Sequence, residues 1–143
     1  MMNNYETAIE CLTQAEKRHE TLPIMLFERD YIDVVRQSAA IMDLSLQSML
    51  QFAGVEVRRH ADLMPLVEGL LNRFPQLDRA DLRRMREICR RLTVKRERTR
   101  VRVHANGSSR DSRGLSREDA VRAIEWSGFM VEAAQRVIKD FQD

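Results

Sequence analysis

The chain has 143 residues, a length typical of one domain that can bury a hydrophobic core. It contains 5 glycines, 3 prolines and 32% charged residues, a composition that favours a helical protein and excludes a β-sandwich or a barrel. The formal net charge is only +2, but residues 79–113 hold 13 Arg or Lys against 4 Asp or Glu, which favours an anionic partner there unless acidic helices neutralise the segment.

The first predicted helix covers residues 5–18. Apolar residues recur at three- and four-residue spacing from Tyr5 to Ala15, and Asn4 precedes them as a cap. Pro23 fits poorly inside a helix because it lacks a backbone N–H. We therefore expect a turn or an irregular segment around Pro23.

The second predicted helix is the longest and covers residues 28–53. Its apolar stripe runs from Tyr31 to Phe52, and Gly54 is expected to end it. Small residues lie on or beside this stripe and would let another helix approach closely; they are Ser38, Ala39 and Ser45.

Three further helices are predicted after the second. Asp62 is a plausible cap for a short third helix, and Asp78 with Asp81 forms a capping-box pattern before a fourth helix whose apolar stripe ends at Leu92. Residues 105–115 are expected to form a mobile loop, and Ser116 with Asp119 opens the last helix. The pattern predicts one all-α domain over residues 1–143, an up-and-down bundle of four to five antiparallel helices.

Sites for metals and cofactors are not indicated. His19, His60 and His104 are scattered, and the sequence has no phosphate-binding or dinucleotide-binding glycine motif. We predict no metal and no cofactor. His60 with Asp62 fits either a catalytic pair or, as we favour, a helix cap.

The segment from Arg98 to His104 carries the strongest chemical signal. In a helix or in an extended chain, at least one arginine comes near His104. An arginine can grip a phosphate and stabilise extra negative charge, and a histidine can accept the proton of a 2′-hydroxyl. This pairing would suffice for metal-independent cleavage of RNA. The alternative is a solvated helix end with cations near the C-terminal dipole.

The order of these elements resembles the HEPN family of small helical bundles over about residues 5–142. The resemblance rests on the long second helix "YIDVVRQSAAIMDLSLQSMLQFAGVEV", on "RRHADLMPLVEGLL", on the arginine-rich "LRRMREICRRLTVKRERTR" and on "SREDAVRAIEWSGFMVEAAQRVI". Active members of the family carry an Arg, four to six residues and a His, which Arg98 and His104 match with Thr99 as the polar spacer. The resemblance implies catalytic roles for Arg98 and His104. Arg96, Arg100 and Arg102 would bind phosphate as electrostatic support.

The resemblance also implies partners. It suggests a homodimer that binds RNA or a nucleotide, as a metal-independent endoribonuclease toxin paired with a minimal nucleotidyltransferase antitoxin. The alternative is a non-catalytic dimeric module that partners a nucleotidyltransferase or only holds phosphate. Trp126, Phe129 and Met130 would suit a dimer face, or equally a core. Cys11 and Cys89 match no disulfide framework, and the chain shows neither a signal peptide nor a membrane span, so a cytoplasmic setting is expected.

Overall fold

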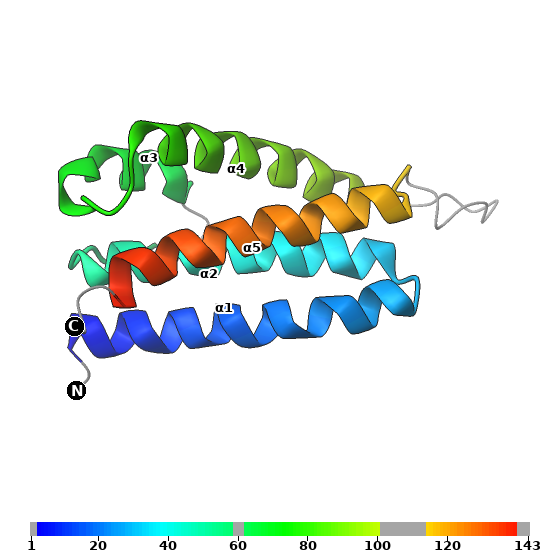
Figure 1. Ribbon diagram of the computed structural model, residues 1–143, viewed down its shortest axis with the longest axis horizontal. Helices are drawn as coiled ribbons and strands as arrows, with labels where there is room; N and C mark the ends of the chain where they lie inside the picture. Colours follow the sequence, from blue (N-terminus) through cyan, green and yellow to red (C-terminus); the bar gives the residue numbers. More distant parts are fainter. Residues whose placement is uncertain (1–2, 59–61, 101–113, 140–143) are drawn as a thin grey trace.

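The computed structural model describes residues 3–58, 62–100 and 114–139, and over these residues the chain is helical with no strand (Figure 1). The all-α prediction is therefore confirmed. The elements in chain order are α1 (Asn4–Phe27), α2 (Tyr31–Phe52), α3 (Leu63–Gly69), the 3₁₀ helix η1 (Leu71–Arg73), α4 (Arg79–Thr99) and α5 (Arg117–Lys139).

The four long helices run up and down, each antiparallel to the one before it (Figure 1). Helix α2 is central, because it contacts α1, α3, α4 and α5. Helices α1 and α5 pack on α2 and on each other, while α4 with α3 forms the opposite side of the bundle. The described residues thus confirm the predicted antiparallel bundle.

Helix α1 continues through Pro23, so the predicted turn there is wrong. Proline removes one backbone hydrogen bond from the helix. Burial of the same face offsets this loss, because Leu22 is fully buried and Met25 packs against the core. The N-cap is also one residue earlier than predicted, since the Asn3 side chain accepts a hydrogen bond from the Glu6 N–H.

The ends of α1 and α2 share one C-terminal motif. After α2, the Gly54 N–H donates to the Gln51 carbonyl and the Val55 N–H donates to the Leu50 carbonyl. Gly54 has φ +84, a left-handed conformation that glycine adopts without strain, so the predicted stop is confirmed. The same two bonds close α1, but there Arg29 takes the left-handed position with φ +61. Because this turn occupies residues 28–30, α2 begins at Tyr31 rather than at residue 28.

The predicted caps of the last two long helices are confirmed. Asp78 accepts from the Asp81 N–H, and the Asp81 carboxylate accepts from the Asp78 N–H, which is a complete capping box. At the start of α5, the Ser116 hydroxyl accepts from the Asp119 N–H and the Asp119 carboxylate accepts from the Ser116 N–H.

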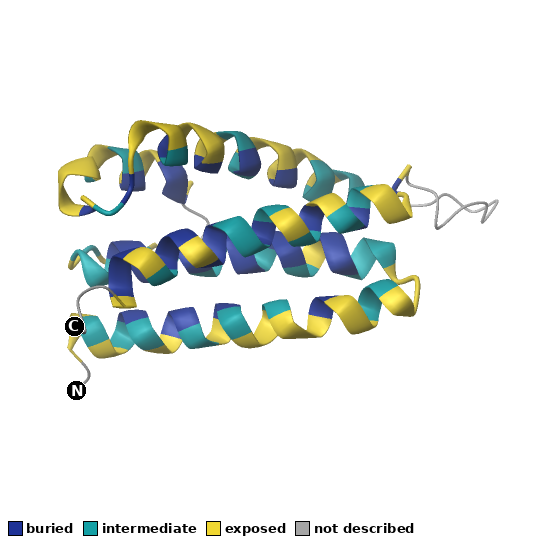
Figure 2. Cartoon of the chain, viewed as in Figure 1, coloured by how far each residue is buried: buried dark blue, intermediate teal, exposed yellow. Residues whose placement is uncertain are grey.

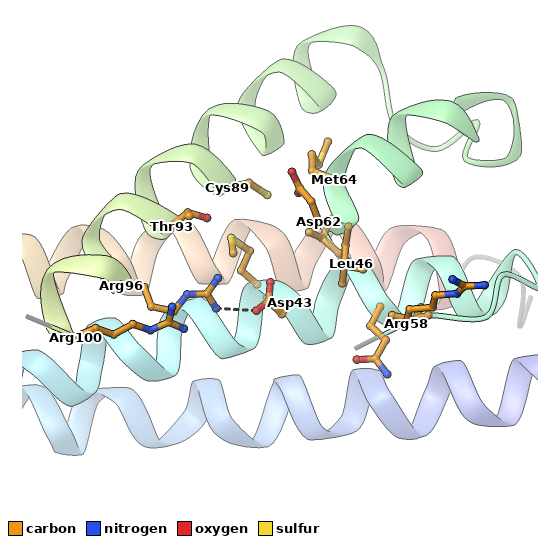
Figure 3. Close-up of a pocket in the computed structure, with 13 residues that line it drawn as sticks. Asp43, Leu46, Arg58, Asp62, Met64, Cys89, Thr93, Arg96 and Arg100 are labelled. Atoms are coloured by element: carbon orange, nitrogen blue, oxygen red, sulfur yellow. Dashed lines mark hydrogen bonds and ion pairs between the residues drawn. The ribbon is translucent and has the colours of Figure 1, made fainter. Parts of the chain in front are cut away.

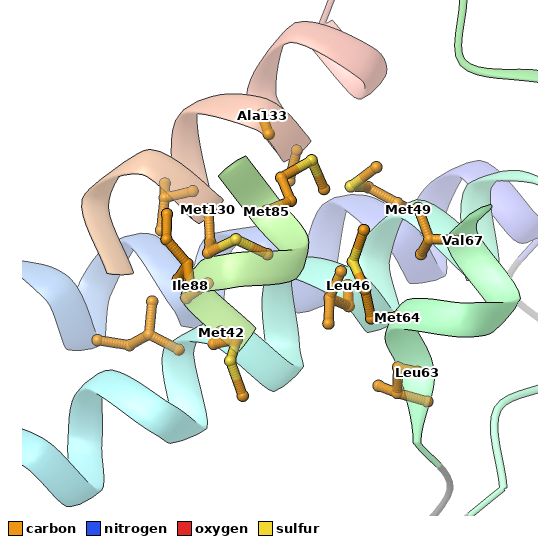
Figure 4. Packing of buried hydrophobic residues seen from close by; sticks show 14 of the residues in the cluster. Met42, Leu46, Met49, Leu63, Met64, Val67, Met85, Ile88, Met130 and Ala133 are labelled. Atoms are coloured by element: carbon orange, nitrogen blue, oxygen red, sulfur yellow. The ribbon is translucent and has the colours of Figure 1, made fainter. Parts of the chain in front are cut away.

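The core lies where α2 meets its neighbours, and buried positions face inward on every α-helix (Figure 2). Methionines from four helices meet there, namely Met42 and Met49 of α2, Met64 of α3, Met85 of α4 and Met130 of α5 (Figure 4). The small residues predicted on α2 are fully buried, and Ser45 satisfies its hydroxyl by donating to the Ile41 carbonyl. No helix among the described residues combines the length and the apolar character needed to cross a membrane.

Candidate functional site

A cleft of about 750 Å³ opens between α2, the start of α3 and the second half of α4 (Figure 3). Three stretches of chain line it. They are Met42, Asp43, Leu46 and Gln47 of α2; Val57, Arg58, Asp62, Leu63 and Met64 around the α2–α3 link; and Cys89, Thr93, Arg96 and Arg100 of α4.

The α4 wall of the cleft follows from helical spacing. Cys89, Thr93, Arg96 and Arg100 are separated by four, three and four residues, so they lie on one face of the helix. Arg96 and Arg100 are one turn apart on this wall. Two guanidinium groups therefore stand together at the same end of the cleft (Figure 3).

Arg96 is held in place by Asp43. Its guanidinium donates to the Asp43 carboxylate over 2.8 Å, and the two side chains are 23% and 44% exposed. The Nε atom of Arg96 is buried and has no hydrogen-bond partner among the described residues. Arg100 is more exposed and pairs with Glu97 over 2.8 Å within α4.

Asp62 lies at the predicted N-cap position of α3 with extended backbone, but its side chain makes no capping bond, so the predicted side-chain cap is wrong. An N-cap carboxylate usually accepts from the second or third N–H of its helix, and the third helical residue here is Pro65, which has no N–H. The Asp62 carboxylate lies at the cleft and is exposed to solvent.

The floor of the cleft is apolar. Met42, Leu46, Leu63 and Met64 line it and are all buried. Burial and, to a lesser extent, the nearby carboxylates together raise the pKa of the Cys89 thiol to about 12. The cleft therefore combines an apolar floor with a charged rim, a pattern common in small-molecule sites.

Comparison with known families identifies the chain. A family model described as the HEPN domain matches residues 8–137. The chain belongs to the HEPN domain family. Its members are generally associated with ribonuclease and nucleotide-related functions. No curated protein matches the chain.

The predicted site residues of this HEPN domain fall in different places. Arg96 and Arg100 line the cleft, whereas Arg98 is on the other side of α4 and donates to the Gly114 carbonyl over 2.5 Å. Arg102 and His104 lie outside the described residues, so the Arg98–His104 pair stays a prediction.

The structure of the HEPN domain tests some of the other predicted residues. His60 lies outside the described residues, and so does the predicted loop apart from Gly114 and Leu115. Met130 is fully buried, so it belongs to the core. Trp126 and Phe129 are half-buried beneath arginines of α4, with Arg84 placed 4.5 Å from the centre of the Phe129 ring.

Sequence reasoning missed two cleft residues of the HEPN domain. Asp43 and Arg58 line the cleft, but neither is among the site residues that the sequence predicts. A signal for Asp43 exists, because it is the only charged residue between Arg36 and Glu56. A lone carboxylate in so long an uncharged stretch indicates a specific partner, which Arg96 supplies.

Within the described residues, no group of three or more His, Cys, Asp or Glu side chains could hold a metal ion. The donors that the cleft does present are guanidinium N–H groups and carboxylate oxygens. These groups bind anions and hydrogen-bond donors.

Proposed function

We propose that this HEPN domain binds RNA or a nucleotide in the cleft between α2, α3 and α4. The observation that supports the proposal is the placement of Arg96 and Arg100 one turn apart on a wall above an apolar floor. A guanidinium donates two parallel hydrogen bonds to a phosphate, and two guanidiniums together suit a phosphodiester or a terminal phosphate. The buried methionine and leucine side chains below them offer a surface for a base.

The finer proposal is a metal-independent ribonuclease that uses Arg98 and His104. The His104 imidazole would take the proton of a 2′-hydroxyl, whose oxygen then attacks the adjacent phosphorus and expels the 5′-oxygen of the next nucleotide. Arg98 would stabilise the charge that builds on the phosphoryl oxygens. Its bond to the Gly114 carbonyl uses one N–H donor and leaves other donors of the guanidinium for phosphate.

A second candidate function is a non-catalytic dimeric module that holds phosphate groups or partners a nucleotidyltransferase. It is favoured by the structural roles of the arginines: Arg96 joins α4 to α2 through Asp43, and Arg98 fastens the start of the next segment at Gly114. In that case the domain would pair with a nucleotidyltransferase by binding it, without cleaving RNA. His104→Ala separates the two functions, because only the ribonuclease loses RNA cleavage while its fold stays intact.

Binding is tested by fluorescence anisotropy with a labelled single-stranded RNA over a series of salt concentrations. The variant Arg96→Ala/Arg100→Ala should bind about tenfold to a hundredfold more weakly, and its logarithmic salt slope should be smaller by about 2. The matched control is Arg79→Ala/Arg83→Ala, which removes the same charge from exposed positions of the same helix. Equal losses in both variants would show general attraction to a basic surface and overturn the cleft as the site.

Whether the domain is a homodimer in solution is measured separately. Light scattering coupled to gel filtration should give twice the monomer mass of 16.8 kDa if the domain is a homodimer. A monomer mass at micromolar protein would contradict the dimer. It would leave the anion-binding proposal untouched, because the cleft is built within one chain.

A further inference from the structure

Charge is distributed unevenly along the cleft. Arg96 and Arg100 stand at one end and Arg58 at the other, while the carboxylates of Asp43 and Asp62 lie between them (Figure 3). A site built only to attract phosphate would not place two carboxylates beside its arginines, because each one repels the ligand. The pair with Arg96 accounts for Asp43, so it is the Asp62 carboxylate that requires a separate explanation.

An ionised carboxylate is only a hydrogen-bond acceptor, so its natural ligand is an O–H or N–H donor. Asp43 already accepts from Arg96. Asp62 makes no hydrogen bond or ion pair with any other described residue, and Pro65 removes one of the two backbone N–H groups that it would otherwise cap. Asp62 is the free carboxylate of the cleft among the residues that the structure describes.

A nucleic-acid strand offers few donors close to its phosphates. The 2′-hydroxyl of ribose is a donor of this kind, and DNA lacks it. RNA and DNA of one sequence carry the same phosphate charge, so both meet the same attraction from the arginines and the same repulsion from the carboxylates. Amino groups of the bases donate equally in RNA and DNA, so only the 2′-hydroxyl lets RNA recover more of that cost than DNA of the same sequence.

We infer that Asp62 is a specificity-determining residue that accepts a hydrogen bond from a ribose 2′-hydroxyl and makes the cleft selective for RNA over DNA. The inference rests on the proposed function, since it assumes that a strand binds at Arg96 and Arg100. It goes beyond that function by assigning the choice of sugar to one side chain. The selectivity is a property of binding and holds whether or not the domain cleaves RNA.

The test compares two short labelled oligonucleotides of adenine and cytosine, one RNA and one DNA of identical sequence. Anisotropy titrations give both dissociation constants, and a gel confirms that the RNA is intact afterwards. We expect the wild type to bind RNA about tenfold more tightly than DNA, the effect of one hydrogen bond to a charged acceptor. Asp62→Ala should weaken RNA binding by about tenfold and leave DNA binding unchanged or tighter, because a repelling charge is removed.

Two further variants keep the result interpretable. Asp62→Asn retains a carbonyl acceptor of the same shape and should keep part of the preference for RNA. Glu125→Ala removes one exposed carboxylate from α5, outside the cleft, and should keep the full preference. Thermal melts should agree among all four proteins, since Asp62 makes no capping bond.

The outcomes separate the inference from the proposed function. A wild type that binds neither oligonucleotide overturns the proposed function. A wild type that binds both equally, or an Asp62→Ala variant that keeps the wild-type ratio of the two constants, overturns the role of Asp62 and leaves phosphate binding in place. Weaker RNA binding by Asp62→Ala, with DNA binding unchanged or tighter, confirms the inference.

Discussion

The Arg96 guanidinium of α4 donates to the Asp43 carboxylate of α2 over 2.8 Å, and this pair joins the two walls of the cleft. Below it, α4 rests on the bundle through its buried stripe of Leu82, Met85, Ile88 and Leu92. Beyond Leu92 the described part of α4 has few buried side chains. The Arg96–Asp43 pair therefore helps to fix the part of α4 that carries the arginines, together with the bond from Arg36 to the Thr99 carbonyl.

The first prediction concerns the strength of this pair. A double-mutant cycle of Asp43→Ala and Arg96→Ala, measured by urea denaturation, should give a coupling energy of about 1 kcal/mol, because both side chains are partly shielded from water. The exposed pair Arg100–Glu97 is the control, and its coupling should stay below about 0.5 kcal/mol. Equal couplings in the two cycles would contradict a special role for Asp43.

A second ion pair fastens α4 to α5. The Lys95 ammonium donates to the Asp119 carboxylate over 2.5 Å, and both side chains are largely buried. Burial alone raises the pKa of Asp119, but the hydrogen bond from Lys95 and those from the Ser116 N–H and hydroxyl outweigh it. Together they hold the pKa at about 2.

This lowered pKa predicts an acid-sensitive fold. The ordinary pKa of an aspartate is about 3.8, so the ionised form of Asp119 stabilises the native state above that pH. The contribution, about 2 kcal/mol, should be lost as the pH falls from about 4 to 2. Unfolding free energies across this range should converge for the wild type and Asp119→Asn. Parallel curves for the two proteins would contradict the prediction.

Lys95→Met supplies a complementary measurement. Without the ammonium, burial of Asp119 is no longer offset, so its pKa should rise and the acid transition should move to higher pH. The two variants thus disturb the same contact in different ways. A Lys95→Met protein with the wild-type acid transition would show that Ser116 alone stabilises the carboxylate.

Most of the fold could be predicted from local sequence signals. The capping pair Asp78–Asp81 and the stop at Gly54 are properties of a few neighbouring residues, and both are confirmed. The prediction failed at Pro23, where burial of Leu22 just before the proline and packing of Met25 beyond it allow the helix to continue. A local pattern does not contain the contacts between helices. These contacts outweigh the tendency of proline to end a helix.

The candidate site could be predicted only in part. Residue type points to Arg96 and Arg100, but which arginines share a wall depends on whether the chain is helical or extended there, and the local sequence allows both. Because α4 extends to Thr99, Arg96 and Arg98 face different ways. Asp43 and Arg58 come from other parts of the chain, and only the packing of α4 on α2 brings them to the cleft.

The turn between α1 and α2 yields a stability prediction. Arg29 holds φ +61, a conformation that costs a residue with a side chain about 1 kcal/mol relative to glycine. Arg29→Gly should therefore raise the unfolding free energy by up to about 1 kcal/mol and the melting temperature by a few degrees. Gly54→Ala, at the equivalent position after α2, should do the opposite. A destabilised Arg29→Gly protein would mean that the arginine side chain contributes more than the backbone strain costs.

The cleft cysteine gives the last prediction. Burial raises the pKa of Cys89 to about 12 and that of Cys11 to about 11, so both thiols are protonated at neutral pH. In a Cys11→Ala protein, the remaining thiol should react with a disulfide reagent at pH 8 about a thousandfold more slowly than a free thiol, since the thiolate is the nucleophile. The same protein unfolded in guanidinium should react at the ordinary rate. Fast reaction of the native protein would show that Cys89 is exposed and ionised, and it would make thiol chemistry in the cleft a competitor to phosphate binding.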